Sequence, residues 1–333
     1  MSHPKLALPK LAWRGTKAAT RSAYRLGTAG SRLAAGALVR RAVKLPPVGA
    51  VPEGRMVTLP GRGQTFVVDV AGPTPQAPTI VLLHALGCTA YLTWFGVLAE
   101  LSRTHRVIAL DLRWHGRGIR SARFRVDDCA DDVAALMDVL GMDRTIVAGY
   151  SLGGAVAQTL WHRHPERVDG LVLASTARNL RGHLGERVFF PMMTLAMHPL
   201  SRVALSKVER VAQTLPEMPS VDLTDPTGWG RAEFRSTSAW SMPEVLTELG
   251  RFNSAPWIGS VDVPTAVVIT GKDKAIPTRR QVRLAASIPD ARVYETPGGH
   301  ASIVLDHDRW MPAFLEAVAD VTGRMPAPRQ VAV

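Results

Sequence analysis

The chain has 333 residues, 46% of them hydrophobic and 20% charged, so it can bury a large core in one or two domains. Two cysteines are too few for a disulfide framework, and no run of 18 or more apolar residues predicts a membrane-spanning helix. Most of the net charge of +12 lies in residues 1–52, which hold ten Lys and Arg and no Asp or Glu; the other 30 Lys and Arg face 28 acids. The nearly neutral remainder gives no reason to expect a nucleic-acid partner.

Residues 1–52 are predicted to form a basic N-terminal extension. Its basic side chains recur every three or four residues from Lys10 to Arg25, which places them on one face of a helix. Residues 1–45 either contact an anionic membrane surface as an amphipathic helix or form a solvated, partly disordered arm, which the interrupting glycines favour. A secretory signal is not indicated. We therefore expect a cytoplasmic protein, free or associated with the inner membrane surface.

From about residue 55 the signals for strands and helices alternate. Residues 56–59 and 64–70 are expected to pair as antiparallel strands around the turn at 60–63. Parallel strands joined by helices imply an α/β fold with one doubly wound sheet, whose chemistry gathers at the carboxyl ends of the strands. Further strands are predicted at 79–83, 107–110, 145–148, 168–174, 265–270 and 291–295, and helices at 91–102, 127–140, 152–164, 278–287 and 306–322.

The alternation stops between residues 178 and 259, where helical patches carry many aromatic and Met side chains. Most of these side chains are expected to pack in a core, and some to line a pocket.

A candidate nucleophile lies in Gly149-Tyr150-Ser151-Leu152-Gly153, between a predicted strand and a predicted helix. A nucleophile at such a sharp turn has strained backbone angles and needs small neighbours, which Gly149 and Gly153 supply. The turn lifts Ser151 Oγ above the sheet, and the helix N-terminus offers the Leu152 N–H to a developing oxyanion. Ser151 could instead be an ordinary helix N-cap, but the strand–turn–helix context favours the nucleophile.

A serine nucleophile needs a general base and an acid that orients the base. Asp273 follows the strand at 265–270, and His300 follows the strand at 291–295 within Pro297-Gly298-Gly299-His300. The order Ser, acid, His is the one expected for a strand–turn–helix nucleophile. The rival residues are Asp262 and Asp290, which precede their strands, and His307, which falls in the last helix.

The oxyanion hole is expected to combine the backbone N–H groups of Leu86 and Leu152. Leu86 belongs to His84-Ala85-Leu86-Gly87, which ends the strand at 79–83. Loop-organising roles, without proton transfer, are expected for His84, His115, Asp111 and Arg113. No metal site is expected, because no third ligand accompanies His162 and His164, and Cys88 and Cys129 have no metal-ligand spacing.

These motifs, together with residues 111–118 and Gly271-Lys272-Asp273, resemble the α/β-hydrolase superfamily, in its branch of esterases, lactonases and C–C hydrolases with a helical cap. The resemblance covers about residues 55–322. It implies an eight-stranded, mostly parallel sheet, with core parts at 53–177 and 260–322, a helical cap at 178–259 and a loose tail at 323–333. It also implies hydrolysis through an acyl-enzyme without a cofactor. Ala85 replaces a glycine common in the family, and this would restrict the oxyanion loop.

The sequence thus predicts a cofactor-independent, carboxylesterase-like or lipase-like serine hydrolase. Its substrate would be a small carboxylic ester, thioester or lactone with an apolar moiety. Two alternatives stay open: acyl transfer or C–C bond hydrolysis with the same triad, and a non-catalytic protein of this fold that binds a ligand or partner. A serine at position 151 disfavours the epoxide hydrolases and haloalkane dehalogenases of this fold, which use a carboxylate nucleophile.

Overall fold

The computed structural model describes residues 47–49, 51–179, 224–237 and 241–326. These residues belong to the second of two units, Leu45–Val333; the first is Met1–Lys44. Most of the predicted basic extension, residues 180–223 and 238–240 of the predicted cap, and the tail beyond residue 326 lie outside the described residues.

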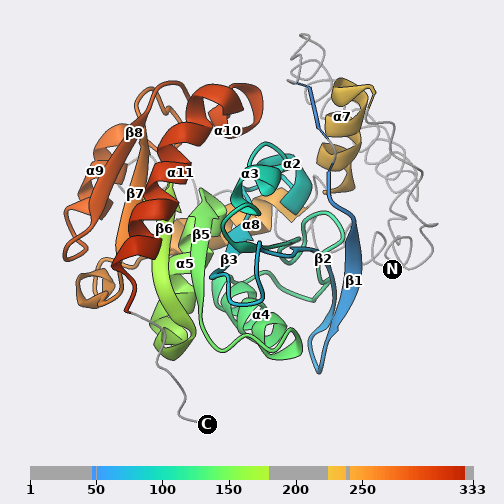
Figure 1. Cartoon of the computed structure of the whole chain (residues 1–333), viewed down its shortest axis with the longest axis horizontal. Helices are drawn as coiled ribbons and strands as arrows, with labels where there is room; N and C mark the ends of the chain where they lie inside the picture. Colours follow the sequence, from blue (N-terminus) through green and yellow to red (C-terminus); the bar gives the residue numbers. More distant parts are fainter. Residues whose placement is uncertain (1–46, 50, 180–223, 238–240, 327–333) are drawn as a thin grey trace, which may run out of the picture. The chain divides into compact units, whose positions relative to one another are not determined.

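The described chain is built around one eight-stranded sheet with the order β1-β2-β4-β3-β5-β6-β7-β8 (Figure 1). The first two strands form the predicted antiparallel hairpin, β2 is antiparallel to β4, and all other neighbours are parallel. The predicted α/β fold with a mostly parallel sheet is therefore confirmed. The strands are β1 Gly54–Leu59, β2 Gly63–Val70, β3 Thr79–Leu83, β4 Arg106–Leu110, β5 Thr145–Tyr150, β6 Val168–Ala174, β7 Thr265–Thr270 and β8 Arg292–Thr296.

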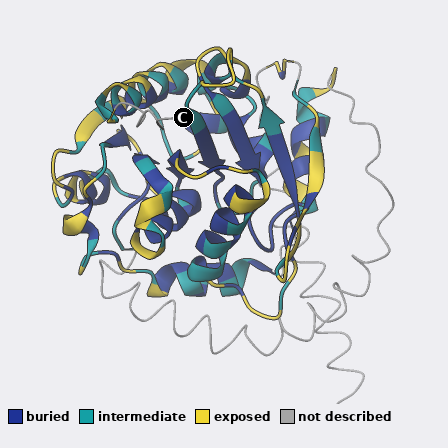
Figure 2. Ribbon diagram, turned by 60° about the horizontal axis from the view of Figure 1, so that its bottom comes forward, coloured by how far each residue is buried: buried dark blue, intermediate teal, exposed yellow. Residues whose placement is uncertain are grey.

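The central strands are apolar because both faces of the sheet are covered. Along β3, Val81 and Leu83 belong to one apolar cluster, whereas Ile80 and Leu82 belong to another. Figure 2 shows the resulting layers, with buried strands between helices whose outer surfaces are exposed. The first cluster includes residues of α4 Val126–Val139, α5 Leu152–Arg163 and α9 Thr278–Ala285; the second includes residues of α2 Ala90–Trp94, α3 Leu98–Leu101 and α11 His307–Arg324.

Two predicted helices differ in the structure. The helix expected over 91–102 is divided into α2 and α3, with Gly96 between them. A Cβ at Gly96 would lie 2.7 Å from the His307 ring, so α11 packs closely where the helix is interrupted. The last helix runs to Arg324, two residues into the tail predicted to be loose, and Arg324 donates to the Thr265 carbonyl at 2.8 Å. Sequence reasoning missed the short helix α10 Ser302–Leu305.

The described part of the inserted segment is helical. It contains α7 Pro226–Ser236 and α8 Met242–Arg251, and α7 begins where the Asp225 carboxylate accepts from the Gly228 N–H at 2.9 Å. The ends of the segment meet at a single antiparallel bridge between Asn179 and Asn253. Short 3₁₀ turns at η1 Pro165–Arg167 and η3 Ile258–Ser260 complete the described elements. Within those residues, none of the helices has both the length and the apolar character needed to span a membrane.

Candidate active site

The turn between β5 and α5 holds Ser151 in a strained conformation, with φ of 53° and ψ of −109°. Close packing leaves no room for a side chain at the neighbouring glycines. A Cβ at Gly149 would lie 2.2 Å from the Gly153 carbonyl oxygen, and one at Gly153 would lie 2.0 Å from the Leu83 carbonyl oxygen. A left-handed backbone costs a non-glycine residue about 1–3 kcal/mol, so the surrounding structure must hold it in place. The sharp turn predicted from the sequence is present.

Ser151, His300 and Asp273 meet at the carboxyl ends of β5, β8 and β7. His300 Nε2 lies 3.0 Å from Ser151 Oγ, and His300 Nδ1 lies 2.7 Å from Asp273 Oδ2. An ionised carboxylate only accepts hydrogen bonds, so Nδ1 carries the imidazole proton and Nε2 is left to accept from the serine hydroxyl. The Asp273 side chain is fully buried, whereas that of His300 is 27% exposed. The three residues have the relative positions that a nucleophile, a base and an orienting acid require.

The Asp273 carboxylate is held by three further donors. Its Oδ1 accepts from the Ala275 and Ile276 N–H groups at 2.9 and 2.8 Å, and its Oδ2 accepts from Gln281 Nε2 at 3.2 Å. Gln281 is completely buried, and its side chain also accepts from the Thr270 N–H and donates to the Ile276 carbonyl. Sequence reasoning missed Gln281, because nothing distinguishes it from an ordinary helix residue.

Tyr150, also missed from the sequence, contacts the backbone of His300. Its hydroxyl donates to the His300 carbonyl at 2.7 Å, and burial raises the pKa of this phenol. Because Tyr150 directly precedes Ser151, the residue next to the strained turn is hydrogen-bonded to the backbone of His300.

The rival acids and histidine lie elsewhere. Asp262 accepts from Trp161 Nε1 at 3.3 Å, Asp290 occupies a turn with φ of 53° before β8, and His307 begins α11 with its Nε2 3.0 Å from Asp308. Within the described chain, none of these three residues forms a hydrogen bond with Ser151 or His300.

The loop after β3 is tied directly to the nucleophile turn. The Gly153 N–H donates to the His84 carbonyl at 3.1 Å, and His84 Nδ1 lies 2.8 Å from the Ala85 carbonyl oxygen. In a trans peptide the carbonyl and the following N–H point in opposite directions, so this hydrogen bond directs the Leu86 N–H away from His84. Within the described chain, neither the Leu86 nor the Leu152 N–H donates to a backbone carbonyl.

The expected restriction by Ala85 does not take the form of backbone strain. The left-handed residue of this loop is Gly87, with φ of 75°, and Ala85 is not among the four non-glycine residues of the described chain with positive φ.

His84 and His115 organise loops, as predicted. His84 Nε2 accepts from the Leu112 N–H at 2.8 Å, and His115 Nδ1 donates to the Arg113 carbonyl at 2.8 Å. The rings are fully buried and contact each other edge to face, and burial lowers the pKa of His84 to about 4 and that of His115 to about 3. Both are therefore neutral near pH 7. Asp111 anchors the same loop through the Ala90 and Arg117 N–H groups, and Arg113 pairs with Asp132.

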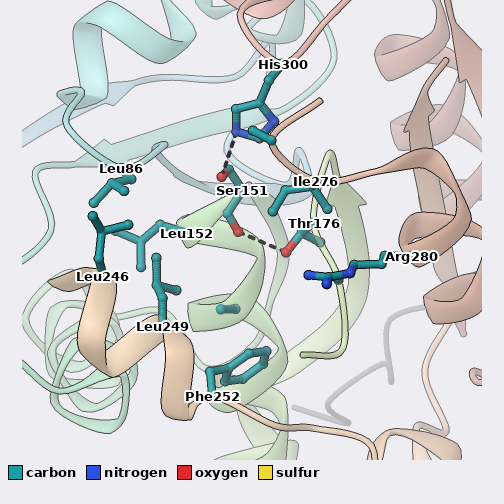
Figure 3. A pocket seen from close by; sticks show the side chains of 13 residues that line it. Leu86, Ser151, Leu152, Thr176, Leu246, Leu249, Phe252, Ile276, Arg280 and His300 are labelled. Carbon is teal, nitrogen blue, oxygen red and sulfur yellow. Dashed lines mark hydrogen bonds between the residues drawn. The ribbon is translucent and has the colours of Figure 1, made fainter. Parts of the chain in front are cut away.

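A cavity of about 260 Å³ opens beside Ser151 (Figure 3). Two of its residues, Leu246 and Leu249, lie on α8 of the inserted segment, so this segment and the core share the cavity. Its described lining comprises Leu86, Ser151, Leu152, Ala155, Thr176, Ala177, Leu246, Leu249, Phe252, Ala275, Ile276, Arg280 and His300.

No metal-binding cluster of three or more His, Cys, Asp or Glu occurs among residues with described positions. His162 stacks on Trp257 with ring centroids 4.3 Å apart, whereas His164 Nε2 contacts Asp131 at 2.9 Å, so the two rings serve separate structural contacts. Cys88 and Cys129 are free thiols.

The chain is similar to several known proteins. It is 34% identical to an uncharacterized protein of Mycobacterium tuberculosis (strain ATCC 25618 / H37Rv), over 41% of this chain and only 40% of that protein. It is 27% identical to RutD of Variovorax paradoxus (strain S110), a candidate carbamate hydrolase, over 78% of this chain and 97% of RutD. The solved enol-lactonase of Burkholderia xenovorans LB400 superposes with a TM-score of 0.63 at 23% identity, covering 80% of this chain and all of that one.

The sequence profile described as "alpha/beta hydrolase fold" matches residues 78–308, which include Ser151, Asp273 and His300. The chain therefore belongs to the α/β-hydrolase fold family.

Proposed function

We propose that the protein hydrolyses a carboxylic ester, thioester or lactone through an acyl-enzyme on Ser151. The observation that carries this proposal is the continuous hydrogen-bonded relay from Ser151 Oγ through the His300 ring to the buried Asp273 carboxylate. Serine is a poor nucleophile at neutral pH, and a neutral imidazole with its free nitrogen 3.0 Å from Oγ can accept the hydroxyl proton.

In the proposed cycle, Ser151 Oγ attacks the carbonyl carbon while its proton passes to His300 Nε2. The Leu86 and Leu152 N–H groups stabilise the oxyanion, and one such donor typically contributes about 3–4 kcal/mol to transition-state stabilisation. His300 then donates its proton to the leaving group, and the acyl-enzyme forms. Water attacks next, transfers a proton to His300 and releases the acid, and the proton returns to Ser151. Asp273 keeps the proton on His300 Nδ1 throughout.

The cavity supports a preference for a substrate with an apolar part. Leu86, Leu152, Leu249, Phe252 and Ile276 contribute apolar walls next to the nucleophile. A cavity of about 150 Å³ can hold a benzene molecule, so about 260 Å³ suits a group of roughly six to ten non-hydrogen atoms.

Activity on p-nitrophenyl esters should therefore rise from acetyl toward medium chains; a steady fall from acetyl to octanoyl would contradict the apolar preference. Carbamates belong in the same panel because of the similarity to RutD.

A fluorophosphonate probe tests the proposed nucleophile. We expect stoichiometric labelling of the Ser151 peptide by mass spectrometry, no labelling in Ser151→Ala and slower labelling in His300→Ala. Ser260→Ala, which removes an exposed hydroxyl, is the matched control and should be labelled like the wild type. Labelling at another residue, or none in the folded protein, would contradict the proposal and favour a non-catalytic binding role.

Product analysis with added alcohols or amines separates hydrolysis from acyl transfer, and a diketone substrate tests C–C bond hydrolysis.

A further inference from the structure

The chain directly after β6 binds the backbone of Ser151 on both sides of its side chain. The Ser151 N–H donates to the carbonyl of Ala174, the last residue of β6, at 3.0 Å. The Ser151 carbonyl accepts from the Thr176 hydroxyl at 2.9 Å. Figure 3 shows this second contact, with the Thr176 side chain beside the nucleophile turn. Both peptide groups of Ser151 are thus held by residues 174–176.

The position of Thr176 is itself fixed by its surroundings. Ser175, the residue before it, has a φ of 46° and is, like Ser151, one of the four non-glycine residues of the described chain with positive φ. The Ser175 hydroxyl lies 2.5 Å from that of Thr270 at the end of β7. Thr176 is only 3% exposed, and a Cβ at Gly154 would lie 2.5 Å from its Cγ2. Since strained backbone persists only where neighbouring contacts hold it, these contacts keep the Thr176 hydroxyl against the turn.

The Thr176 hydroxyl acts on a peptide group that carries an oxyanion donor of the proposed cycle. The Ser151 carbonyl and the Leu152 N–H belong to one trans peptide, in which they point in opposite directions. A donor bound to the carbonyl therefore sets the direction of the Leu152 N–H. Helix α5 gives the same carbonyl two longer contacts, from the Gly154 and Ala155 N–H groups at 3.1 and 3.3 Å. The Thr176 contact is the shortest of the three.

We propose that Thr176 is a positioning residue, whose hydroxyl holds the Ser151–Leu152 peptide so that the Leu152 N–H is directed at the developing oxyanion. This inference rests on the proposed function, which assigns that N–H to the oxyanion hole. An oxyanion donor stabilises the charge that develops in the transition state more than the uncharged carbonyl of the bound ester. Loss of the Thr176 hydroxyl should therefore lower kcat and leave KM nearly unchanged.

Two pairs of proteins isolate the hydroxyl at position 176. Thr176→Val keeps the shape of the wild-type side chain, and Thr176→Ser differs from Thr176→Ala only in the hydroxyl. With p-nitrophenyl hexanoate, we expect the member without the hydroxyl to have a kcat about tenfold lower in each pair, with KM within about twofold. The matched control is Thr159→Val, which removes a similarly buried hydroxyl that donates to the Ala155 carbonyl at 2.9 Å, and it should keep the wild-type kcat.

A transition-state analogue separates positioning from a general structural role. 1,1,1-Trifluoro-2-octanone adds to a serine hydroxyl and places a negative charge on the former carbonyl oxygen, whereas 2-octanone binds without forming a stable adduct. Loss of the Thr176 hydroxyl should raise the Ki of the fluorinated ketone about tenfold and leave that of 2-octanone within about twofold. Urea unfolding measures the stability of each variant. If Thr176→Val does not fold, the comparison of Thr176→Ser with Thr176→Ala decides.

Three results would overturn the role of Thr176: an unchanged kcat within both pairs, an equal loss of kcat in Thr159→Val, or the same change in Ki for the two ketones. Fluorophosphonate labelling of the wild type distinguishes the two proposals. A wild type labelled at Ser151, with equal kcat within both pairs, disproves only the role of Thr176. An unlabelled wild type disproves the hydrolase and this inference with it.

Discussion

At the scale of single residues, the Asp273 carboxylate depends on a buried amide. Gln281 Nε2 donates to Asp273 Oδ2, the same oxygen that faces His300 Nδ1. Gln281→Met keeps the length of the side chain and removes this donor. We expect kcat to fall about tenfold with a smaller change in KM, because the acid is less well oriented for the transition state, and the free energy of unfolding to fall by about 1–3 kcal/mol because buried backbone partners lose their hydrogen bonds.

Steady-state kinetics and urea unfolding check this prediction. Leu284→Ala, a fully buried change on the same helix, supplies a variant of lower stability that should retain kcat. If both variants lose kcat in proportion to their loss of stability, Gln281 has only a structural role.

The two buried histidines should make the fold sensitive to acid. The pKa is lowered to about 4 in His84 and to about 3 in His115, against about 6.5 in the unfolded chain, so unfolding at low pH takes up protons. Their contribution to stability is complete above pH 6.5 and is lost as the pH falls toward these lower values. At pH 5 each histidine should therefore lower the free energy of unfolding by about 2 kcal/mol relative to its value well above pH 6.5.

Urea unfolding between pH 5 and pH 8 measures this dependence. His115→Gln should be less stable at pH 8 but show a shallower loss of stability on acidification, because one proton-linked group has been removed. An equal slope in the variant and the wild type would contradict the assignment.

Sequence patterns revealed some of these residues and not others, for a physical reason. The proximity of Ser151, Asp273 and His300 could be predicted because each follows its own strand and a nearby glycine marks the turn at each of them. Gln281 and Tyr150 act through hydrogen bonds to partners that only the folded sheet brings near. Arg280 follows Arg279 at the start of a polar helix, and no spacing rule shows that one of the two is buried and the other exposed.

At the scale of elements, the inserted segment is fastened to the core through α7. The Glu233 carboxylate accepts from the Thr89 hydroxyl and pairs with Arg117 at 3.2 Å, and Arg117 also lies over the Phe66 ring at 3.7 Å. Glu233 is almost completely buried, and burial raises its pKa. Breaking such a pair by removing one partner typically costs about 3–5 kcal/mol. Glu233→Ala should therefore lower the free energy of unfolding by that order and expose α7 to cleavage.

Urea unfolding and limited digestion with thermolysin measure the two effects. Arg231→Gln, an exposed change of charge on the same helix, should behave like the wild type. Resistance of α7 to thermolysin in Glu233→Ala, together with an unchanged unfolding transition, would show that other contacts hold this helix.

The predicted bounds were most accurate for buried strands, because a continuous apolar run marks where such a strand begins and ends. β3, β6 and β7 have the predicted bounds. Helix ends were less accurate: α2 and α3 are separated at Gly96, where the ring of His307, distant in sequence, packs. α11 continues to Arg324 because its guanidinium binds a carbonyl of β7. Both differences come from tertiary contacts that local patterns do not contain.

At the scale of the whole chain, positive charge is concentrated in the first 52 residues of the sequence. Ten of the 40 Lys and Arg lie in residues 1–52, which have no acids. If this extension contacts anionic lipid, as one interpretation of the sequence predicts, the full chain should sediment with phosphatidylserine vesicles and not with phosphatidylcholine vesicles. Binding should disappear on deletion of residues 1–45 and in about 1 M salt, where the Debye length is about 3 Å. Equal partition of the full and shortened chains would leave the solvated-arm interpretation.

In the turn after β7, the backbone and the side chains of the same residues have different roles. The backbone N–H groups of Ala275 and Ile276 hold the acid, while the same two residues and Arg280 face the cavity. Side-chain exchange at 275 and 276 can therefore change the lining of the cavity without removing a donor from Asp273. A proline at either position, or a one-residue insertion, would remove or displace such a donor. Laboratory evolution of new substrate preferences should accumulate replacements in this turn while its length stays constant.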